Sequence, residues 1–245
     1  MVRADSARPR LSGIVDWRLL IEAPRPAREQ MARDAQLGED SRPTVRWFTW
    51  DPPAVSLGLK QEVPVWLRAP AWRRSGLDWV RRPSGGGIAF HGSDVSLAVV
   101  VPRVLSVPLD ALMRAVCESA ARVCRSFGMT ARPVLQAPSA GRITYCLAEP
   151  SPYAVMAGSK KVAGFALRRL ASSWLIEGSM LVKPLPDRLA AGVPAEVLDG
   201  LRAQAVPLAE AAPSPVAEDD VMSRWAGSWA EWWDESLMAS LAERG

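Results

Sequence analysis

The chain alternates short apolar stretches with polar turns along most of its length. The stretches are rich in Val, Leu, Ile and Trp and are bounded by Gly, Pro, Asp or Ser, which is typical of strands in a globular domain. A longer helical pattern interrupts them, so the order of elements predicts an α/β domain of mixed α+β type. The pattern predicts strands over residues 14–21, 45–50, 54–59, 77–82, 95–101, 143–147, 153–157, 162–168 and 174–181.

The clearest predicted helix runs from Pro108 to Phe127. Its apolar side chains recur every three or four residues, charged residues occupy the other face, and Gly128 stands where a helix commonly stops. Cys117 and Cys124 are seven residues apart on the apolar stripe, so we expect both to be inert thiols in the core. The stripe consists of Leu109, Leu112, Met113, Val116, Ala120, Val123 and Phe127.

The character of the chain changes at Lys183. Proline and alanine dominate up to Pro215, and an apolar stripe of Trp225, Trp229, Trp232 and Leu237 then predicts an amphipathic terminal helix that packs back on the domain. We therefore divide the chain into a flexible tail over residues 1–12, a catalytic domain over 13–182, and a connection with a helical segment over 183–245.

Composition narrows the class of protein. A chain of 245 residues can bury the core of one large domain. The longest apolar run, over residues 95–101, is too short to cross a bilayer, and the N-terminus lacks the apolar stretch of a signal peptide. Three cysteines without a C-x-x-C pair fit a reducing compartment. We expect a cytoplasmic monomer that binds neither membrane nor nucleic acid.

The net charge is +4, and this excess of positive charge favours acidic protein partners. The basic residues are scattered and no nucleic-acid-binding motif frames them. A single histidine excludes a site built from several histidines, and we expect no metal.

The segment from Val80 to Gly92, VRRPSGGGIAFHG, is the strongest local signal for a binding site. Three consecutive glycines let the backbone approach a ligand closely and turn several N–H groups toward one oxygen atom. An ordinary glycine-rich turn between strands explains the same run. The spacing matches neither the dinucleotide fingerprint nor the phosphate loop. If the segment binds a ligand, the candidate contacts are Arg81, Ser84, Gly85, Gly86 and Gly87, and His91 is either a general base or a structural residue.

Four segments in order resemble one enzyme family. REQMARDAQL is similar to its first helix, RPTVRWFTWDPPAVSLGLKQ to its first hairpin, the glycine segment to its Arg/Gly signature, and AGSKKVAGFALRR to its lysine strand. The family is that of the lipoate-protein ligases and octanoyltransferases, and the resemblance spans residues 17–182. It implies the fold of the biotin and lipoyl ligases, with a mixed β-sheet flanked by helices, and aligns Lys161, Gly164 and Ala166 with the active-site strand.

Cys146 is the residue on which the implied mechanism depends. Taken alone, it is more often a small buried hydrophobic residue. The order Cys, Pro-Ser, Tyr, Gly-x-Lys-Lys nevertheless resembles the cysteine-dependent octanoyltransferases, which implies that Cys146 is the nucleophile. The Asn-Asp pair that ATP-dependent lipoate ligases tend to carry in this region is missing. A neighbouring cation favours the thiolate form of a cysteine, and Lys161 could supply that cation.

The resemblance implies an octanoyl (lipoyl) transferase that needs no cofactor. The donor would be an acyl-carrier-protein thioester, and the acceptor a lysine of a lipoyl-domain protein such as the glycine cleavage H protein or a 2-oxoacid dehydrogenase E2. We expect the acidic carriers to dock on a basic surface around Arg81, Arg82, Arg168 and Arg169. Two alternatives remain: an ATP- and magnesium-dependent lipoate ligase that forms an acyl-adenylate, and a non-catalytic protein that binds the carriers.

Two positions depart from the family pattern. The chain has Leu167 where the transferases usually read Gln, and Glu177 where they read His in His-Gly-Ser. Leu167 removes an amide from a strand that faces the expected site, and Glu177 replaces a group that can carry positive charge by one that carries negative charge. These changes indicate either a rearranged hydrogen-bonding scheme for another acyl group or acceptor, or a divergent paralogue.

Overall fold

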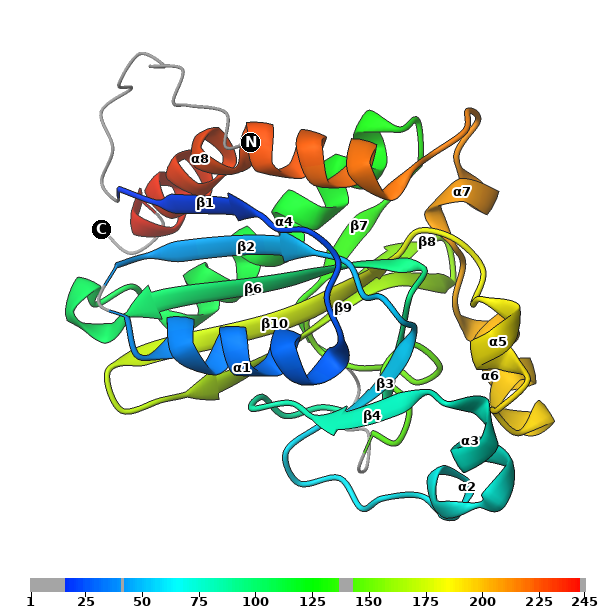
Figure 1. The fold of residues 1–245 in the computed structure, drawn as a ribbon. Helices are drawn as coiled ribbons and strands as arrows, with labels where there is room; N and C mark the ends of the chain where they lie inside the picture. Colours follow the sequence, from blue (N-terminus) through cyan, green and yellow to red (C-terminus); the bar gives the residue numbers. More distant parts are fainter. Residues whose placement is uncertain (1–15, 41, 137–142, 243–245) are drawn as a thin grey trace.

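A sheet of seven strands forms the centre of the molecule (Figure 1). The computed structural model describes residues 16–40, 42–136 and 143–242, without the side chains of residues 230, 232 and 234–242. Within the described part only β1 and β2 run parallel, and the other neighbouring strands of this sheet are antiparallel. The order across the sheet is β1 (Arg18–Ile21), β2 (Thr44–Phe48), β6 (Asp94–Pro102), β10 (Ser173–Leu181), β9 (Lys160–Arg169), β8 (Ala154–Ala157) and β7 (Arg132–Val134).

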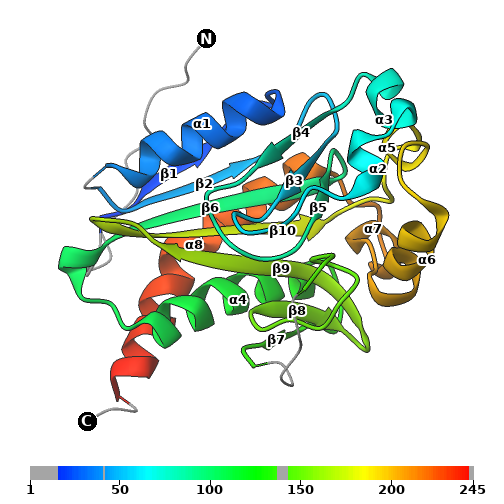
Figure 2. The same cartoon turned by 90° about the horizontal axis from the view of Figure 1, so that it is seen from below.

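A smaller sheet and one helix cover one face of the large sheet (Figure 2). The helix is α1 (Ala27–Gly38), and the small sheet has the order β4 (Asp78–Arg81), β3 (Ala54–Leu57), β5 (Ala89–His91). Two short helices, α2 (Val65–Arg68) and α3 (Pro70–Ser75), join β3 to β4. The segment that resembles the family's first helix is therefore helical, as expected.

Two helices cover the other face. They are α4 (Leu109–Ser126), which follows the 3-10 turn Arg103–Leu105, and α8 (Glu218–Ala242). The predicted apolar stripe of α4 is buried, although Leu109 is only partly so. Trp225 and Trp229 of α8 are buried as predicted, together with Trp233. The side chains of Trp232 and Leu237, the other predicted members of that stripe, lie outside those described.

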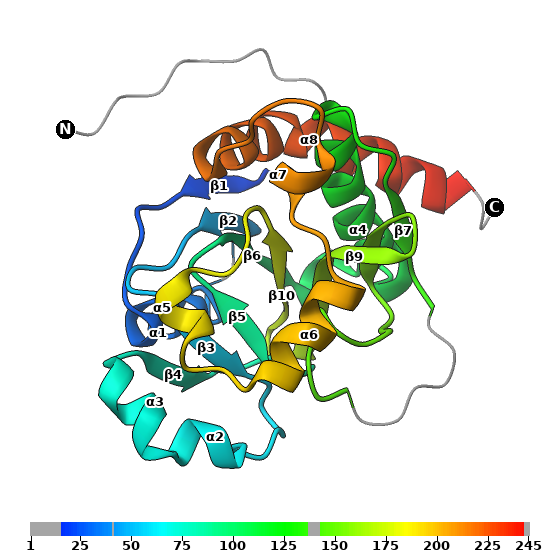
Figure 3. The same cartoon turned by 90° about the vertical axis from the view of Figure 1, so that its right-hand side faces the viewer.

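The Pro/Ala-rich connection forms three short helices instead of an irregular segment (Figure 3). They are α5 (Asp187–Ala190), α6 (Ala195–Gln204) and α7 (Leu208–Ala211), and each begins directly after a proline. Proline has no backbone N–H to leave unpaired and its φ suits the start of a helix. Two backbone hydrogen bonds attach the connection to the rest of the domain. The N–H of Val206 donates to Lys161 O, and the N–H of Ala209 donates to Val182 O.

The alternation of side chains along the central strands gives the large sheet two different faces. On β6, Val95 and Val99 point toward α4 and α8, while Asp94 and Ser96 point to the other side. On β10, Ile176 and Met180 join the apolar core, while Glu177 and Ser179 point away from it. One face is therefore a core and the other carries polar side chains.

The prediction of a strand over residues 143–147 is wrong. This segment is a turn, and only Tyr145 makes a bridge, to Ile88. The carboxylate of Glu149 accepts hydrogen bonds from the N–H groups of Thr144 and Tyr145 and so bends the chain back on itself. The other predicted strands are present, although several are shorter than expected, and β5 and β7 were not predicted. No helix in the described part of the chain is long and apolar enough to cross a membrane.

Candidate active site

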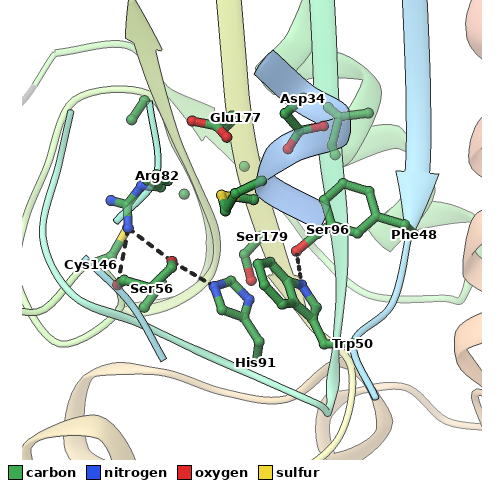
Figure 4. Close-up of a pocket in the computed structure, with 16 residues that line it drawn as sticks. Asp34, Phe48, Trp50, Ser56, Arg82, His91, Ser96, Cys146, Glu177 and Ser179 are labelled. Atoms are coloured by element: carbon green, nitrogen blue, oxygen red, sulfur yellow. Dashed lines mark hydrogen bonds between the residues drawn. The ribbon is translucent and has the colours of Figure 1, made fainter. Parts of the chain in front are cut away.

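A pocket lies between the polar face of the large sheet and the layer formed by α1 and the small sheet (Figure 4). It has about 420 Å³ of space between its side chains, counting the part that opens to solvent. Met31, Phe48, Trp50 and Ala89 supply apolar wall, and the polar wall includes Asp34, Ser56, Arg82, His91, Glu177 and Ser179. The pocket is thus partly apolar and also contains several buried polar groups.

Cys146 borders this pocket from the turn before β8. Its backbone N–H donates to Ile88 O at 2.8 Å, and Ile88 N–H donates to Thr144 O at 2.7 Å, so the turn is fixed against the exit of the glycine segment. A Cβ placed on Gly164 would lie 3.3 Å from Cys146 Sγ. The absence of a side chain at Gly164 leaves room for the thiol beside β9.

Lys161 holds the turn that carries Cys146. Its Nζ donates to Cys146 O at 2.8 Å, to Ser151 Oγ at 2.8 Å and to Glu149 O. Burial lowers the pKa of Lys161, and attraction to Cys146 and Glu149 offsets part of that effect. All three protons of the ammonium group have acceptors, so the group places a positive charge near the thiol while it fixes the position of the turn.

The glycine segment wraps around Arg82. The Arg82 guanidinium donates to Gly85 O at 2.8 Å, to Gly87 O at 2.7 Å, and to Ser56 Oγ at 3.1 Å. A Cβ on Gly87 would come within 2.8 Å of Thr144 O, so glycine is required there for the close approach of the two segments. The carbonyl groups of Gly85 and Gly87 therefore face the arginine.

The two arginines of the segment have different roles. Arg81 Nη1 donates to the carbonyl oxygens of Gly58, Leu59 and Gln61, which fixes the turn after β3. Arg82 is 7% exposed and lines the pocket, whereas Arg81 is exposed and lies outside the pocket wall. The prediction that Arg82 belongs to an exposed docking surface is wrong.

His91 is part of a buried hydrogen-bonded row. Its Nε2 is 2.7 Å from Ser56 Oγ and its Nδ1 is 2.9 Å from Asp94 Oδ2, while its ring stacks on Trp50 with centroids 4.0 Å apart. Burial alone would raise the pKa of Asp94, but His91 and the hydrogen bonds from Ser96 and Ser179 lower it overall. Asp94 therefore carries a negative charge that orients the imidazole.

The structure brings together most of the residues expected from the sequence. Cys146, His91, Gly164 and Ala166 line the pocket, Ser84 donates its N–H to Glu177 at its edge, and Gly85 and Gly86 line a neighbouring surface groove. Sequence reasoning missed the contributions of Asp34, Trp50, Ser56, Asp94 and Ser179. Alternation along β6 and β10 was the available signal for two of them, Asp94 and Ser179. Among the described residues, no cluster of three or more His, Cys, Asp or Glu could hold a metal ion.

Comparison with known proteins gives one consistent result. The sequence pattern of the family described as lipoyl protein ligase A/B catalytic domain matches residues 26–229. Octanoyltransferase LipM of Symbiobacterium thermophilum is 32% identical over 240 residues, covering 88% of this chain and 85% of that protein. Octanoyltransferase LipM of Kyrpidia tusciae is 33% identical over 241 residues, covering 88% and 86%.

Solved structures show the same fold. A bi-partite lipoate protein ligase from Thermoplasma acidophilum has a TM-score of 0.68 at 22% identity, covering 93% of this chain and 92% of that one. A lipoate-protein ligase A bound with ATP has a TM-score of 0.68 at 21% identity, covering 92% and 94%.

Proposed function

Because the chain belongs to the lipoyl protein ligase A/B catalytic-domain family, we propose that it transfers an octanoyl group through a thioester on Cys146. The donor is an octanoyl thioester on an acyl-carrier protein, and the acceptor is a lysine of a lipoyl-domain protein. The protein is an acyltransferase, like the relatives named octanoyltransferase. The observation that carries the proposal is a cysteine thiol that borders a pocket beside Gly164 and near a buried lysine.

The first transfer is an exchange between two thioesters of similar energy. The Cys146 thiolate attacks the donor carbonyl carbon, a C–S bond forms to Cys146, the C–S bond to the carrier breaks, and the carrier leaves as a thiolate that takes up a proton. Lys161 is a positioning residue in this step because it holds Cys146 O, Glu149 O and Ser151 Oγ at once.

The acyl chain fills the apolar part of the pocket. Phe48 and Trp50 line it on the side away from Cys146 (Figure 4), and Met31 is part of the pocket wall as well. Burial of each methylene contributes about 0.8 kcal/mol, so the length of the space between these side chains determines which chain length is preferred.

A second candidate nucleophile is Ser56. The row Ser56, His91, Asp94 has the hydrogen-bond order of a serine triad, with distances of 2.7 and 2.9 Å. Ser56 Oγ, however, also accepts a hydrogen bond from Arg82, and the residue is 1% exposed. We assign the row to orientation of the pocket wall. A Ser56→Ala protein that still becomes acylated on Cys146 supports this assignment.

A basic groove beside the glycine segment suits acidic carriers. Lys60, Arg168 and Arg169 line it together with Gly85 and Gly86, and its space is about 990 Å³ including the part open to solvent. Gly86 also lies against Ala166 of the pocket wall, since a Cβ on Gly86 would be 3.4 Å from Ala166 Cβ. A carrier bound in this groove has its attached group close to the pocket.

The test is an intact-mass measurement after mixing the protein with octanoyl-acyl-carrier protein. We expect a mass increase of one octanoyl group without ATP, and its loss when a lipoyl-domain protein is added. An increase that requires ATP and magnesium supports the ligase mechanism instead. A stable complex with no covalent change supports a binding protein and contradicts the proposal.

A further inference from the structure

Two buried carboxyl groups lie side by side in the pocket, and the first acyl transfer does not use them. Asp34 of α1 is 0% exposed and Glu177 of β10 is 8% exposed. The groups are close enough to interact through a hydrogen bond, and Figure 4 shows both on the same side of the pocket. A buried pair of this kind is costly unless it has a proton or a cation to share.

Each carboxyl group has one oxygen with a donor and one without. Asp34 Oδ1 accepts from Arg46 Nη1 at 2.6 Å, and Glu177 Oε2 accepts from the N–H of Ser84 at 2.9 Å. Apart from the two carboxyl groups themselves, no donor among the described residues reaches Asp34 Oδ2 or Glu177 Oε1. The buried and unsatisfied acceptors of the pair therefore belong to the wall that a substrate contacts.

The pKa of Asp34 is raised by its surroundings. Burial raises the pKa of Asp34, the negative charge of Glu177 raises it further, and Arg46 offsets only part of the effect, so the pKa lies well above its usual range. The other ionisable groups nearby are Glu22, which pairs with Arg46, and Arg82 and His91 on the pocket wall.

Strand register puts Glu177 close to the thiol. Glu177 of β10 pairs with Ala166 of β9. Gly164, two residues before Ala166 on β9, faces Cys146 Sγ. Two residues of strand span about 6.6 Å, and side chains of Glu177, Ala166 and Cys146 all line the pocket. An amine nitrogen that reaches a thioester on Cys146 from this pocket therefore enters a space that the Glu177 carboxyl group also lines.

The second transfer requires a proton acceptor that the other groups do not provide. A lysine amine has an ordinary pKa of about 10.4, so it arrives as an ammonium ion that cannot attack. Lys161 is itself a donor to three acceptors, and both ring nitrogens of His91 are already hydrogen-bonded. Apart from the neighbouring Asp34 carboxyl group, no donor among the described residues reaches Glu177 Oε1, which is a buried acceptor on the pocket side.

We infer that Glu177 is the group that binds the ammonium of the acceptor lysine and takes its proton, an inference that rests on the proposed octanoyl transfer. An N–H bond of the ammonium breaks as an O–H bond forms on Glu177. The amine lone pair then attacks the thioester carbonyl, a C–N bond forms, and the C–S bond to Cys146 breaks. A second amine proton goes to the leaving sulfur, and the proton on Glu177 returns to solvent.

The test separates the two halves of the reaction and uses two amines. Octanoyl-enzyme is formed from octanoyl-acyl-carrier protein, isolated, and mixed with butylamine, which is protonated near neutral pH, or with methoxyamine, which is not. For Glu177→Gln we expect normal acylation of Cys146. Transfer to butylamine and to the lipoyl-domain lysine falls by about 10²-fold at pH 7, in line with the loss of a general base, and transfer to methoxyamine is unchanged. The defect in transfer to butylamine shrinks as the pH approaches the pKa of the amine.

Two further variants control for structural damage. Glu177→His restores a proton acceptor of the type that the resembling family has at this position, and we expect it to recover transfer to butylamine. Glu118→Gln removes a carboxylate of α4 that pairs with Arg122 and Arg125 on the other side of the sheet, and we expect no change.

Two results overturn the inference. One is normal transfer to butylamine by Glu177→Gln, and the other is an equal loss with both amines, which indicates that Glu177 only shapes the pocket. A wild-type protein that never forms octanoyl-enzyme contradicts the proposed function itself, and so the two failures are distinguishable.

Discussion

The two faces of the large sheet are built from alternate residues of the same strands, and they differ in almost every property. The face under α4 and α8 buries Val99, Ile176 and Met180 in an apolar core. The opposite face places Ser96, Glu177 and Ser179 in a pocket. Because neighbouring residues of a strand point to opposite sides, a strand can hold the fold together with one set of side chains while the other set performs chemistry.

The cysteines illustrate the same difference. Burial raises the pKa of the Cys124 thiol on α4 to about 12, and burial likewise raises the pKa of Cys117. Cys146 lies on the pocket side, is only partly buried and borders open space. Chemical reactivity is thus expected on one face alone.

The largest expected effect comes from Cys146→Ser. A serine hydroxyl without a strong base is a poor nucleophile near neutral pH, so octanoyl transfer should fall by a factor on the order of 10³ or more. Cys124→Ser, on the other face, should lower the melting temperature and keep transfer at temperatures where the protein is folded. Intact mass and melting curves of both variants are the measurements. Full transfer by Cys146→Ser would contradict the covalent mechanism.

Substitution on the apolar face should change stability without changing the chemistry. Trp229 is 1% exposed and its ring lies 5.7 Å from those of Trp17 and Trp47. Trp229→Ala should lower the free energy of unfolding by about 3–5 kcal/mol, because it removes a large buried ring and leaves a cavity. Urea unfolding measures the loss, and octanoyl transfer below the transition is the control. A pocket-specific defect in the folded variant would show that the faces are coupled.

Lys161→Ala should lower transfer by about 10²-fold, because the turn that carries Cys146 loses three hydrogen bonds and a misplaced nucleophile reacts slowly. The thiol itself remains, so exhaustive alkylation with iodoacetamide should still label Cys146. Lys161→Arg should not restore the rate, since a planar guanidinium does not fit the place of a compact ammonium. Recovery with arginine would indicate that charge alone matters.

A group on the polar face should also make the free energy of unfolding depend on pH. The pKa of Asp94 is lowered in the folded protein, so Asp94 contributes stability that is present above its unfolded pKa of about 3.9 and is lost as the pH falls through the folded value. The difference in unfolding free energy between wild type and Asp94→Asn should therefore be larger at neutral pH than in acid below the unfolded pKa. Urea unfolding of both proteins across this range measures it. A difference that does not vary with pH would contradict this account.

The smallest expected effect concerns docking. The Michaelis constant for octanoyl-acyl-carrier protein should rise several-fold as salt screens the groove of Lys60, Arg168 and Arg169 over a Debye length of about 8–10 Å. Arg169→Glu should raise it at low salt. A small octanoyl thioester enters by apolar burial and should respond to neither change. Equal responses by both donors would contradict docking in this groove.

The sequence predicted the parts of the fold that depend on local periodicity. The stripe of α4, the strands β6 and β10, and the glycine segment are all visible in the order of residues. The turn at Cys146 was not predicted. Its shape depends on the hydrogen bonds that Glu149 accepts from Thr144 and Tyr145, and on backbone hydrogen bonds to Ile88, which is more than fifty residues away in the sequence. The short helices after Lys183 were not predicted, because the prolines that directly precede them were interpreted as marks of a connecting segment.

The sequence did not predict the role of a site residue where that role depends on how two distant segments pack together. Arg81 and Arg82 are neighbours with the same chemistry, and only the packing of the small sheet decides which one is buried. The resemblance drew attention to Glu177, but its proximity to Asp34 follows from the packing of α1 on β10, which no spacing along the chain reveals.

The pairing of β6 with β10 has a consequence for a chain that is still being synthesised. Asp94 pairs with Leu181, so the wall that contains Glu177 and Ser179 can join the sheet only after the residues of β10 have been synthesised. A nascent chain that ends shortly after Cys146 has the thiol but lacks β9 and β10 beside it. We therefore expect Cys146 to react with an acyl donor only in chains that already include β9 and β10.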